Sequence, residues 1–503
     1  MQLTTRRNFL RTSAAAGLAA GWTGFSPFAI RLKAASPNDE IGIGVIGLGG
    51  IDIPGGVGGR GRQLIAALRQ LPGARIVAIC DVDQAVLDHE LQPFKDRNEQ
   101  VATYVDLRKL LDDPHVNAVA VATPNHWHAL ATIWACQAGK DVYVEKPFSY
   151  NIWEGRQMVA AARQFGRMVQ VGTQRRSSDL LPRVFEYLRG GAIGPIRRVH
   201  AIIYRARDGM GRATSPLTIP STVNFDLWSG PAPQAPLMRS QLHYEWHWFW
   251  ATGNGEIGNN GVHIIDIARW ALGQQQAPPR ALSIGGRFGF LDSGETANTQ
   301  IALFDYQPAP LICEIRNFVA NKKADGIGRF RSLQRGAMID CEGGYFAGDS
   351  EGGTVFDKQG RQVQEFTMDR QRGDADTAAH VANFLAAVRS RNARDLHAEA
   401  LEGHFSAACA HMANTSYRLG KQLPPQTIQE SIQGNTELAD AFERCRDYLR
   451  SNGVDLQTTH AVSGPWVTLD PQQERFVGDF ADEANRLSRR SYREPFVVPQ
   501  LTS

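Results

Sequence analysis

A carboxylate, an amide and an amine stand at the ends of three apolar runs in the first third of this sequence. They are Asp81, Asn125 and Lys146. Short apolar runs bounded by turn residues predict buried strands. The carboxyl ends of parallel strands meet at one edge of a sheet, where ligands bind, so we expect the three side chains to share one site. The runs are Arg75–Cys80, Ala118–Ala122 and Asp141–Val144.

A glycine-rich turn precedes these residues. The run Ile41–Ile46 predicts a first buried strand, and Gly47-Leu48-Gly49-Gly50 follows it at once. Such a turn lets the backbone approach a pyrophosphate, which then rests on the N-terminus of the next helix. After an inserted segment, that helix is expected to begin near Gly59 or Gly61. The pattern predicts a dinucleotide-binding unit.

Asp81 stands where an acid would bind the adenine ribose hydroxyls. An acid there disfavours a 2′-phosphate, so we expect NAD, held through turnover, while Arg60 and Arg62 leave NADP open. The residues expected to bind the dinucleotide are Gly47, Gly49, Gly50, Gly61, Asp81, Thr123, Pro124, Asn125, His128, Glu145, Lys146, Gln174 and Arg175.

Lys146 is the candidate for proton transfer. Taking a hydride from a secondary alcohol requires that its proton leaves too, so a base must contact the oxygen. An exposed lysine, with a pKa of about 10.4, is protonated at neutral pH. Burial beside a positive nicotinamide ring disfavours the ammonium, and lowering the pKa by about 3 units corresponds to about 4 kcal/mol. A surface lysine that ends a strand is the structural alternative.

His263 is the second candidate for proton transfer, because an unperturbed histidine titrates near pH 6.5. It lies in an apolar run that predicts a helix over Val262–Leu272. If the helix extends back, Asn259, His263 and Asp266 share one face, so Asn259 and Asp266 join the catalytic candidates. The alternatives are a core histidine and, for Asp266, a pairing with Arg269 on the helix.

The segment Tyr244–Trp250 is rich in aromatic residues. Sugars stack their C–H faces on aromatic rings, which offer a large apolar area. A hydrophobic core or a subunit contact is the alternative. The residues expected to contact substrate are Lys146, Tyr204, Trp246, His247 and His263.

Composition bounds the class of protein. A length of 503 residues allows two or three domains, and 43% hydrophobic with 21% charged residues excludes a disordered chain, a coiled coil and a multi-span membrane protein. Five of the 54 basic residues and none of the 51 acidic ones lie in residues 1–35, so the remainder carries a net charge of −2 and gives no electrostatic case for nucleic acid. The six scattered cysteines show no metal-ligand spacing, so we expect no metal and no structural disulfide.

The first residues look like a targeting signal. Thr5-Arg6-Arg7-Asn8-Phe9-Leu10 is a twin-arginine pattern, and the apolar stretch after it is too short to span a bilayer. Such signals send folded proteins through the bacterial inner membrane, so a cofactor made in the cytosol can be loaded before export. We expect residues 1–35 to be a signal peptide, the twin-arginine export machinery to be a partner, and the mature protein to be periplasmic. A disordered basic tail is the alternative.

Several motifs in the same order resemble the Gfo/Idh/MocA oxidoreductase family, most of all its exported branch with twin-arginine signals. They are Gly47–Gly50, Thr123–His128, Glu145-Lys146-Pro147 and Gly261–Asp266. In that family the lysine and the later histidine act on the substrate hydroxyl, which carries over to Lys146 and His263. Many members have Asp where this sequence has Asn259, a departure that puts a carboxylate-assisted proton relay in doubt.

The resemblance implies an α/β protein with an N-terminal Rossmann-type parallel sheet domain. A C-terminal α+β domain with an open, mainly antiparallel sheet would follow. We place these domains at residues 36–178 and 179–425, with a C-terminal extension over residues 426–503 that packs on the core. The apolar alternation of the second-half strands favours a homo-oligomer.

Three classes of function remain open. The first is an NAD(P)-dependent oxidoreductase that acts on a hydroxyl group of a sugar, glycoside or polyol. The second is an NAD-dependent enzyme that cleaves glycosides by transient oxidation and elimination, which suits a compartment where free NAD is scarce. The third is a non-catalytic sugar-binding relative that kept the fold.

Overall fold

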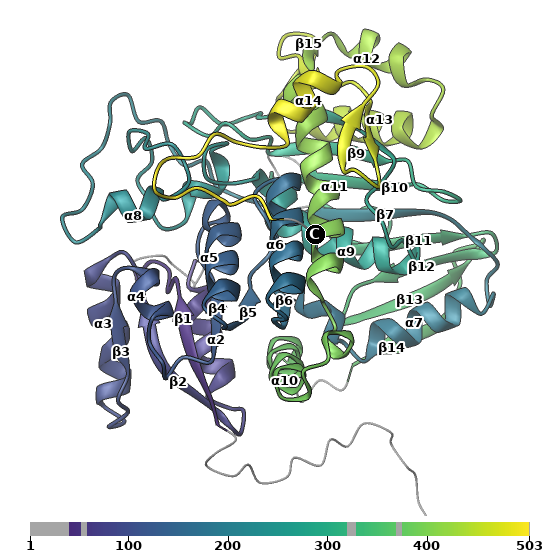
Figure 1. The fold of residues 1–503 in the computed structure, drawn as a ribbon. Coiled ribbons are helices and arrows are strands. Elements are labelled where there is room, and N and C mark those ends of the chain that lie inside the picture. The colour runs from purple at the N-terminus through teal and green to yellow at the C-terminus, as the bar shows by residue number, and fades with distance from the viewer. Residues whose placement is uncertain (1–39, 52–57, 319–327, 369–374, 502–503) are drawn as a thin grey trace, which may run out of the picture. The chain divides into compact units, whose positions relative to one another are not determined.

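The first sheet has six strands, all parallel, in the order β3-β2-β1-β4-β5-β6 (Figure 1). The structure, a computed structural model, describes residues 40–51, 58–318, 328–368 and 375–501. The strand order reverses between β1 and β4, and in such sheets the crevice at this point receives the ligand. The strands are β1 (Ile41–Ile46), β2 (Ala74–Cys80), β3 (Ala102–Tyr104), β4 (Ala118–Val121), β5 (Asp141–Val144) and β6 (Val169–Val171).

Helices cover both faces of this sheet, which is why β1, β4 and β5 are buried along their whole length. Helices α5 and α6 pack in one core and α2 and α3 in another, and α10 joins α2 and α3 although it comes much later in the chain. The helices are α2 (Arg60–Leu68), α3 (Gln84–Lys95), α4 (Leu107–Leu111), α5 (Asn125–Gln137), α6 (Ile152–Gln164) and α10 (Ala375–Ser390).

The second sheet is mainly antiparallel, with β10 parallel to β7. Its main path runs β14-β13-β12-β11-β7-β10-β9-β8-β16-β15, and β17 also pairs with β8. Its strands are β7 (Ile196–Tyr204), β8 (Arg280–Gly286), β9 (Thr299–Phe304), β10 (Leu311–Arg316), β11 (Arg335–Cys341), β12 (Gly344–Gly348), β13 (Gly352–Asp357), β14 (Gln362–Thr367), β15 (Lys421–Leu423), β16 (Ala461–Ser463), β17 (Val467–Asp470) and β18 (Arg475–Val477). The α/β architecture predicted from the sequence is therefore confirmed.

Helices α7, α9 and α11 pack on one face of the second sheet, and α12 and α13 pack on the other. The alternation of β7 follows from this, because Val199, Ala201 and Ile203 join the first of these cores while Ile202 and Tyr204 turn to the opposite side. The helices are α7 (Leu180–Arg189), α9 (Val262–Ala271), α11 (Ala400–Leu419), α12 (Pro425–Ile432), α13 (Thr436–Ser451) and α14 (Ala481–Leu487).

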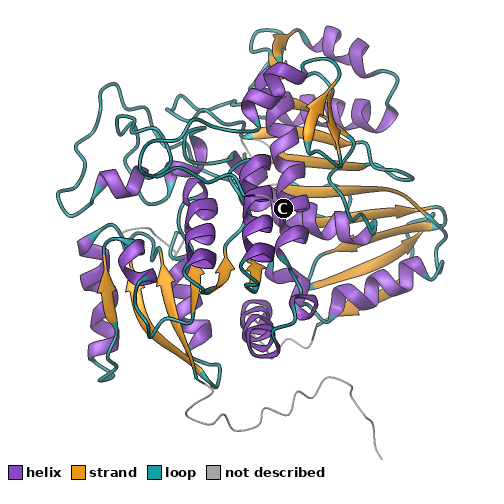
Figure 2. Ribbon diagram, viewed as in Figure 1, coloured by secondary structure: helices purple, strands orange, loops and turns teal. Residues whose placement is uncertain are grey.

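The two halves share their helices. The chain from Glu40 onward is one compact unit, in which α11 packs against α6 as well as on the second sheet. The C-terminal extension adds β16 and β17 to the sheet edge at β8, and Phe496 packs edge-on against Trp127 of α5. Between β7 and α9 the chain is mostly loop, interrupted by the short helix α8 (Phe225–Ser229) (Figure 2).

Some predicted features lie outside the described residues or differ from the structure. The twin-arginine segment belongs to residues 1–39, which are not described. Strands β12 to β14 were not predicted. All six cysteines are free and buried. None of the described helices is long and apolar enough to cross a membrane, and the described residues contain no cluster of His, Cys, Asp or Glu suited to a metal ion.

Candidate active site

A cavity of about 430 Å³ extends from the glycine turn after β1 to the residues around the ends of β7 and β11. Its volume lies in the range of small-molecule sites. The predicted residues that line it are Gly47, Gly49, Asp81, Thr123, Pro124, Asn125, Glu145, Lys146, Gln174, Arg175, Trp246, His247, Asn259 and His263. The strand ends of the first sheet and the helix that carries His263 therefore meet in one place.

The glycine turn has the shape that a dinucleotide requires. Gly47 and Gly49 both have φ of +85°, a conformation that favours glycine. A Cβ atom on Gly61 would lie 2.0 Å from the carbonyl oxygen of Gly47, so only glycine lets α2 pack against the turn. Gly61 is thus the helix-packing glycine. It does not line the cavity, and neither does Gly50, whose carbonyl oxygen accepts a hydrogen bond from Arg62.

Asp81 is tied to the same turn. Its carboxylate accepts hydrogen bonds from the backbone N–H of Leu48 at 2.8 Å and of Asp83 at 3.1 Å. Burial raises the pKa of Asp81, while nearby His243 and these two donors oppose the shift. Each oxygen of a carboxylate can accept more than one hydrogen bond, so Asp81 retains acceptor capacity toward the cavity that it lines.

Three residues that line the cavity carry a buried polar atom without a hydrogen-bond partner in the described part of the chain. Thr123 Oγ1, Gln174 Oε1 and His263 Nδ1 are buried and have no hydrogen-bond partner among the described residues. Leaving such a group unsatisfied costs about 1–3 kcal/mol. With the glycine turn and Asp81, these atoms fit a dinucleotide that enters between β1 and β4.

Lys146 follows β5 and is fixed by Asn259. Its Nζ donates hydrogen bonds to the Asn259 side-chain oxygen at 2.9 Å and to the Asn259 backbone oxygen at 3.1 Å. Burial lowers the pKa of Lys146 to about 8, against the opposing attraction of Glu145. The carboxylate of Glu145 is occupied by Arg60, whose Nε lies 2.7 Å away. Burial alone would raise the pKa of Glu145, but Arg60 and Lys146 bring it below its usual value.

Asn259 reaches Lys146 from a π-helical turn and not from the α-helix that the spacing predicted. The turn spans Ile257–Gly261 and leads into α9, which begins at Val262. π-helical turns often occur at functional sites. Here the turn brings both oxygens of Asn259 to the lysine.

His263 lies in the first turn of α9 and lines the cavity. Burial lowers its pKa well below the usual value, and the positive charges of Lys146 and Arg175 add to this effect. The imidazole is therefore neutral at physiological pH. It can form a hydrogen bond with a substrate oxygen, but it lacks the extra proton that an imidazolium could donate.

The predicted aromatic segment contributes to the wall. Trp246 and His247 line the cavity with their rings stacked 3.6 Å apart, and burial lowers the pKa of His247 well below its usual value. The alternative prediction, that the aromatic segment forms a hydrophobic core, is also correct in part, because Trp246 packs in a cluster with Trp228 and Leu237.

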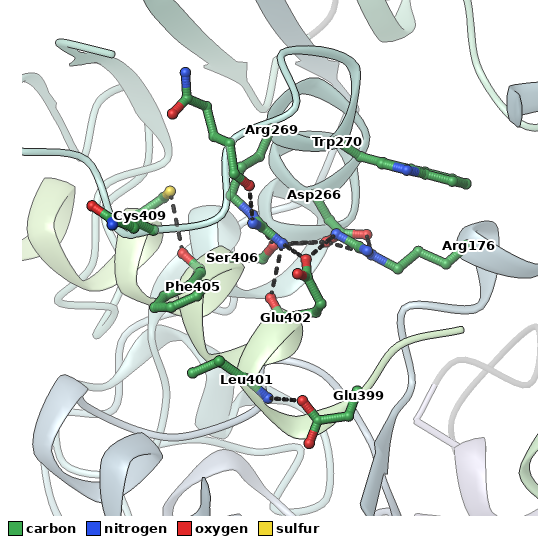
Figure 3. A network of polar contacts seen from close by, with 12 residues as sticks. Arg176, Asp266, Arg269, Trp270, Glu399, Leu401, Glu402, Phe405, Ser406 and Cys409 are labelled. Atoms are coloured by element: carbon green, nitrogen blue, oxygen red, sulfur yellow. Dashed lines mark hydrogen bonds and ion pairs between the residues drawn. The ribbon is translucent and has the colours of Figure 1, made fainter. Parts of the chain in front are cut away.

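Asp266, a predicted catalytic candidate, is not brought into the cavity, and the predicted alternative of a pairing with Arg269 is what the structure shows. It lies outside the cavity lining, where it accepts a two-pronged ion pair from Arg176 at 2.8 Å and a hydrogen bond from Ser406 at 2.6 Å. Arg269 and Glu402 complete this buried network, which links α9 to α11 (Figure 3). Asp266 holds the helix that carries His263.

Tyr204 and His128 also need correction. Tyr204 does not line the cavity, because it turns to the other face of β7, where its hydroxyl donates to Glu314 at 2.8 Å. His128 of α5 is absent from the lining as well. Its ring nitrogens are hydrogen-bonded to the backbone oxygens of Pro147 at 2.7 Å and Thr123 at 2.9 Å. It links the loops after β4 and β5 and does not reach the ligand space.

The sequence alone did not indicate several cavity residues. Arg207 and Arg335 line it from the loop after β7 and from the start of β11, and Asn260 lies beside them. The alternation of β7 past Arg205 could have indicated Arg207. No local motif marks Arg335.

Comparisons with known proteins define the class of protein. Residues 41–173 match the model of an oxidoreductase family with an NAD-binding Rossmann fold. Residues 209–302 match the C-terminal alpha/beta domain of the same family. Both models are those of the Gfo/Idh/MocA oxidoreductase family, to which these two segments are similar.

Curated relatives include a levoglucosan dehydrogenase from Pseudarthrobacter phenanthrenivorans, 30% identical over 191 residues, which are 36% of this chain and 42% of that protein. A glycosyl hydrolase family 109 protein from Shewanella baltica is 34% identical over 170 residues, 31% of this chain and 36% of that protein. The chain thus spans less than half the length of these relatives.

Solved structures share the fold. The WlbA dehydrogenase from Bordetella pertussis, in complex with NADH and UDP-GlcNAcA, has a TM-score of 0.53 and 19% identity, over 74% of this chain and 96% of that one. An oxidoreductase from Agrobacterium radiobacter, in complex with NAD+, L-tartaric acid and magnesium, has a TM-score of 0.53 and 17% identity over 74% and 96%.

Proposed function

We propose that this protein is an NAD-dependent oxidoreductase that acts on a secondary hydroxyl group of a sugar, glycoside or polyol, with Lys146 as the acid–base group. The observation that carries the proposal is the pair of hydrogen bonds from Lys146 to Asn259. A neutral amine has two N–H groups and one lone pair. When Asn259 accepts both N–H groups, the lone pair is left to receive a proton from a substrate hydroxyl.

The pKa of Lys146 fits this role. A pKa of about 8 leaves about one amine in ten neutral at pH 7, whereas an exposed lysine would have fewer than about one in a thousand. In oxidation, Lys146 accepts the hydroxyl proton and becomes an ammonium. In reduction, the N–H that Asn259 does not accept donates its proton to the carbonyl oxygen. NAD, when bound, supplies the hydride acceptor.

The neighbours of Lys146 support binding and orientation. His263 lines the cavity as a neutral imidazole and can hold the same substrate oxygen. Trp246 and His247 provide an aromatic wall for the apolar face of a sugar. A levoglucosan dehydrogenase and a dehydrogenase crystallised with a nucleotide sugar are among the similar proteins, which supports a carbohydrate substrate.

Asp81 favours NAD over NADP. Arg60 and Arg62, which left NADP open in the sequence, favour NAD as well because both are held by other groups. Arg60 is paired with Glu145, and Arg62 is bound to the Gly50 carbonyl and lies 3.3 Å from Glu90. We further propose that the protein keeps NAD through turnover. If the twin-arginine pattern directs export, a retained cofactor is the form that functions in the periplasm.

A second candidate is a glycoside-cleaving enzyme that oxidises one carbon transiently and then eliminates the leaving group. The glycosyl hydrolase family 109 relatives favour it. In this scheme Lys146 would serve the oxidation step in the same way. Release of an aglycone without net NADH formation would distinguish it from a dehydrogenase, and absence of any nicotinamide binding would leave only a sugar-binding protein.

The test is to purify the exported protein, identify its retained nucleotide by mass spectrometry and screen sugars and glycosides by absorbance and product mass. We expect bound NAD and a product oxidised at one hydroxyl. A preparation that neither contains nor binds a nicotinamide dinucleotide would contradict the proposal. Replacing both Arg6 and Arg7 by Lys should retain the precursor in the cytoplasm, and unchanged export would refute the twin-arginine route. Size-exclusion chromatography with light scattering tests the expected homo-oligomer.

A further inference from the structure

The acids that line the cavity lie on one side of it and most of the arginines on the other, although Arg60 and Lys146 lie with the acids. Among the described residues, its three carboxylates all come from the half formed by the first sheet, and they are Asp81, Asp106 and Glu145. The opposite half holds four arginines and no acid among the lining residues that the structure describes, three from the ends of β7 and β11 and one from the turn after β6. They are Arg175, Arg205, Arg207 and Arg335.

The acids behind these arginines are unevenly placed, and Asp376, near Arg175, is one of them. Glu256 is fully buried and pairs with Arg207 at 2.8 Å. Asp349 is shared, because it lies 2.9 Å from Arg175 and 3.7 Å from Arg335. The other acid near Arg335, at 3.4 Å, is a glutamate whose side chain is 73% exposed, so water screens it.

Arg205 has no carboxylate within 4.0 Å in the described parts of the chain. Its guanidinium instead donates to the side-chain oxygen of Asn260 at 3.3 Å. Asn260 directly follows the asparagine that holds Lys146. An arginine without a carboxylate partner among the described residues therefore lies next to the proposed reaction centre, in a cavity where desolvation strengthens its attraction for an anion.

We propose that these arginines form an anion subsite, and that the substrate carries a carboxylate or phosphate group near the hydroxyl that is oxidised. The inference rests on the proposed function for the hydroxyl chemistry, and it narrows the substrate to acidic sugars or sugar phosphates. Arg205 and Arg335 are the specificity residues. The pyrophosphate of the dinucleotide is not their ligand, because the glycine turn and the N-terminus of α2 that would receive it belong to the other half of the cavity.

The test compares matched anionic and neutral ligands on the NAD-loaded protein by isothermal titration calorimetry. The pairs are methyl β-D-glucuronide with methyl β-D-glucoside, and glucose 6-phosphate with glucose. We expect at least one anionic member to bind about tenfold more tightly than its neutral partner, with an advantage that shrinks as salt rises. Preference within the first pair identifies a carboxylate, and preference within the second identifies a phosphate.

Variants separate this subsite from the dinucleotide site. Arg205→Gln and Arg335→Gln should each lower the affinity for the preferred anion about 10- to 100-fold, the value of one or two charge-assisted hydrogen bonds, and leave NAD affinity unchanged. Arg361→Gln is the matched control, since that side chain is 77% exposed and lies outside the cavity lining. Thermal unfolding checks that each variant is folded.

Neutral ligands that bind as well as the anionic ones in both pairs would overturn the proposal. Loss of NAD affinity in the two variants would also overturn it, because the arginines would then serve the dinucleotide. Binding is measured without turnover, so a failure of hydride transfer would count against the proposed function and not against the anion subsite.

Discussion

Replacing Asn259 by Asp tests how this site sets the protonation of Lys146. Asn259 accepts the lysine hydrogen bond through a neutral oxygen 2.9 Å from Nζ. A carboxylate at that distance favours the ammonium, and an opposite charge within about 4–6 Å shifts a pKa by about 1–3 units. The pKa of Lys146, about 8 in the native protein, should rise to about 9–11 in Asn259→Asp.

The consequence differs between the two directions of reaction. Oxidation needs the neutral amine, whose fraction at pH 7 falls about tenfold for each unit by which the pKa rises. We therefore expect oxidation at pH 7 to slow by about 10- to 1000-fold in Asn259→Asp and to recover as the pH is raised. Reduction uses the ammonium, which already predominates at pH 7, so it should change little.

The assay is the pH dependence of nicotinamide absorbance change in both directions with the substrate found by screening. Asn259→Leu is the control of similar size, because it removes the side-chain acceptor oxygen without adding charge. In this control, the apparent pKa below which the oxidation rate falls should not rise. If the apparent pKa of the oxidation rate in Asn259→Asp stays near 8 or falls, Lys146 is not the group that titrates and the reasoning is refuted.

Three further changes probe the cofactor, the base and the support of α9. Lys146→Ala should abolish turnover while NAD still binds, as followed by fluorescence titration, and activity near that of the native protein would remove Lys146 from the mechanism. Asp81→Ala should weaken NAD binding about 10- to 100-fold through loss of charge-assisted hydrogen bonds to the ribose, and an unchanged dissociation constant would show that the acid does not touch the dinucleotide. Asp266→Asn removes the fully buried carboxylate partner of Arg176, which keeps Glu402 at 3.1 Å, and should cost up to about 3–5 kcal/mol of unfolding free energy. Asp357→Asn, which weakens a surface ion pair with Arg361, should cost much less, and equal losses in denaturant unfolding would contradict this account of the network.

The parallel sheet could be predicted because its information is local. Each strand is a short apolar run, and the strand-end rule then places Asp81, Asn125 and Lys146 together without knowledge of any other contact. All three of these residues line the cavity. The rule could not show that the ring nitrogens of His128 contact two backbone carbonyl oxygens, because those contacts depend on how the loops after β4 and β5 pack.

The wrong predictions for residues beyond the first sheet have a common cause. Tyr204 and Asp266 lie close in sequence to true cavity residues, but β7 alternates its side chains and α9 turns Asp266 toward Arg176. Helical spacing from His263 predicted Asn259 as a site residue by the wrong geometry, since Asn259 lies in a π-helical turn. Arg335 reaches the cavity only through pairing of β11 with β7, a contact between strands far apart in the sequence.

The most direct measurement for the central claim is a crystal structure of the protein with NAD and a substrate analogue. The account predicts a nicotinamide ring in the same cavity as Lys146, with Nζ within hydrogen-bonding distance of the analogue oxygen on the carbon that faces C4 of the ring. A nicotinamide bound elsewhere, or an Nζ that touches no ligand oxygen while Asn259 still holds it, would contradict the account.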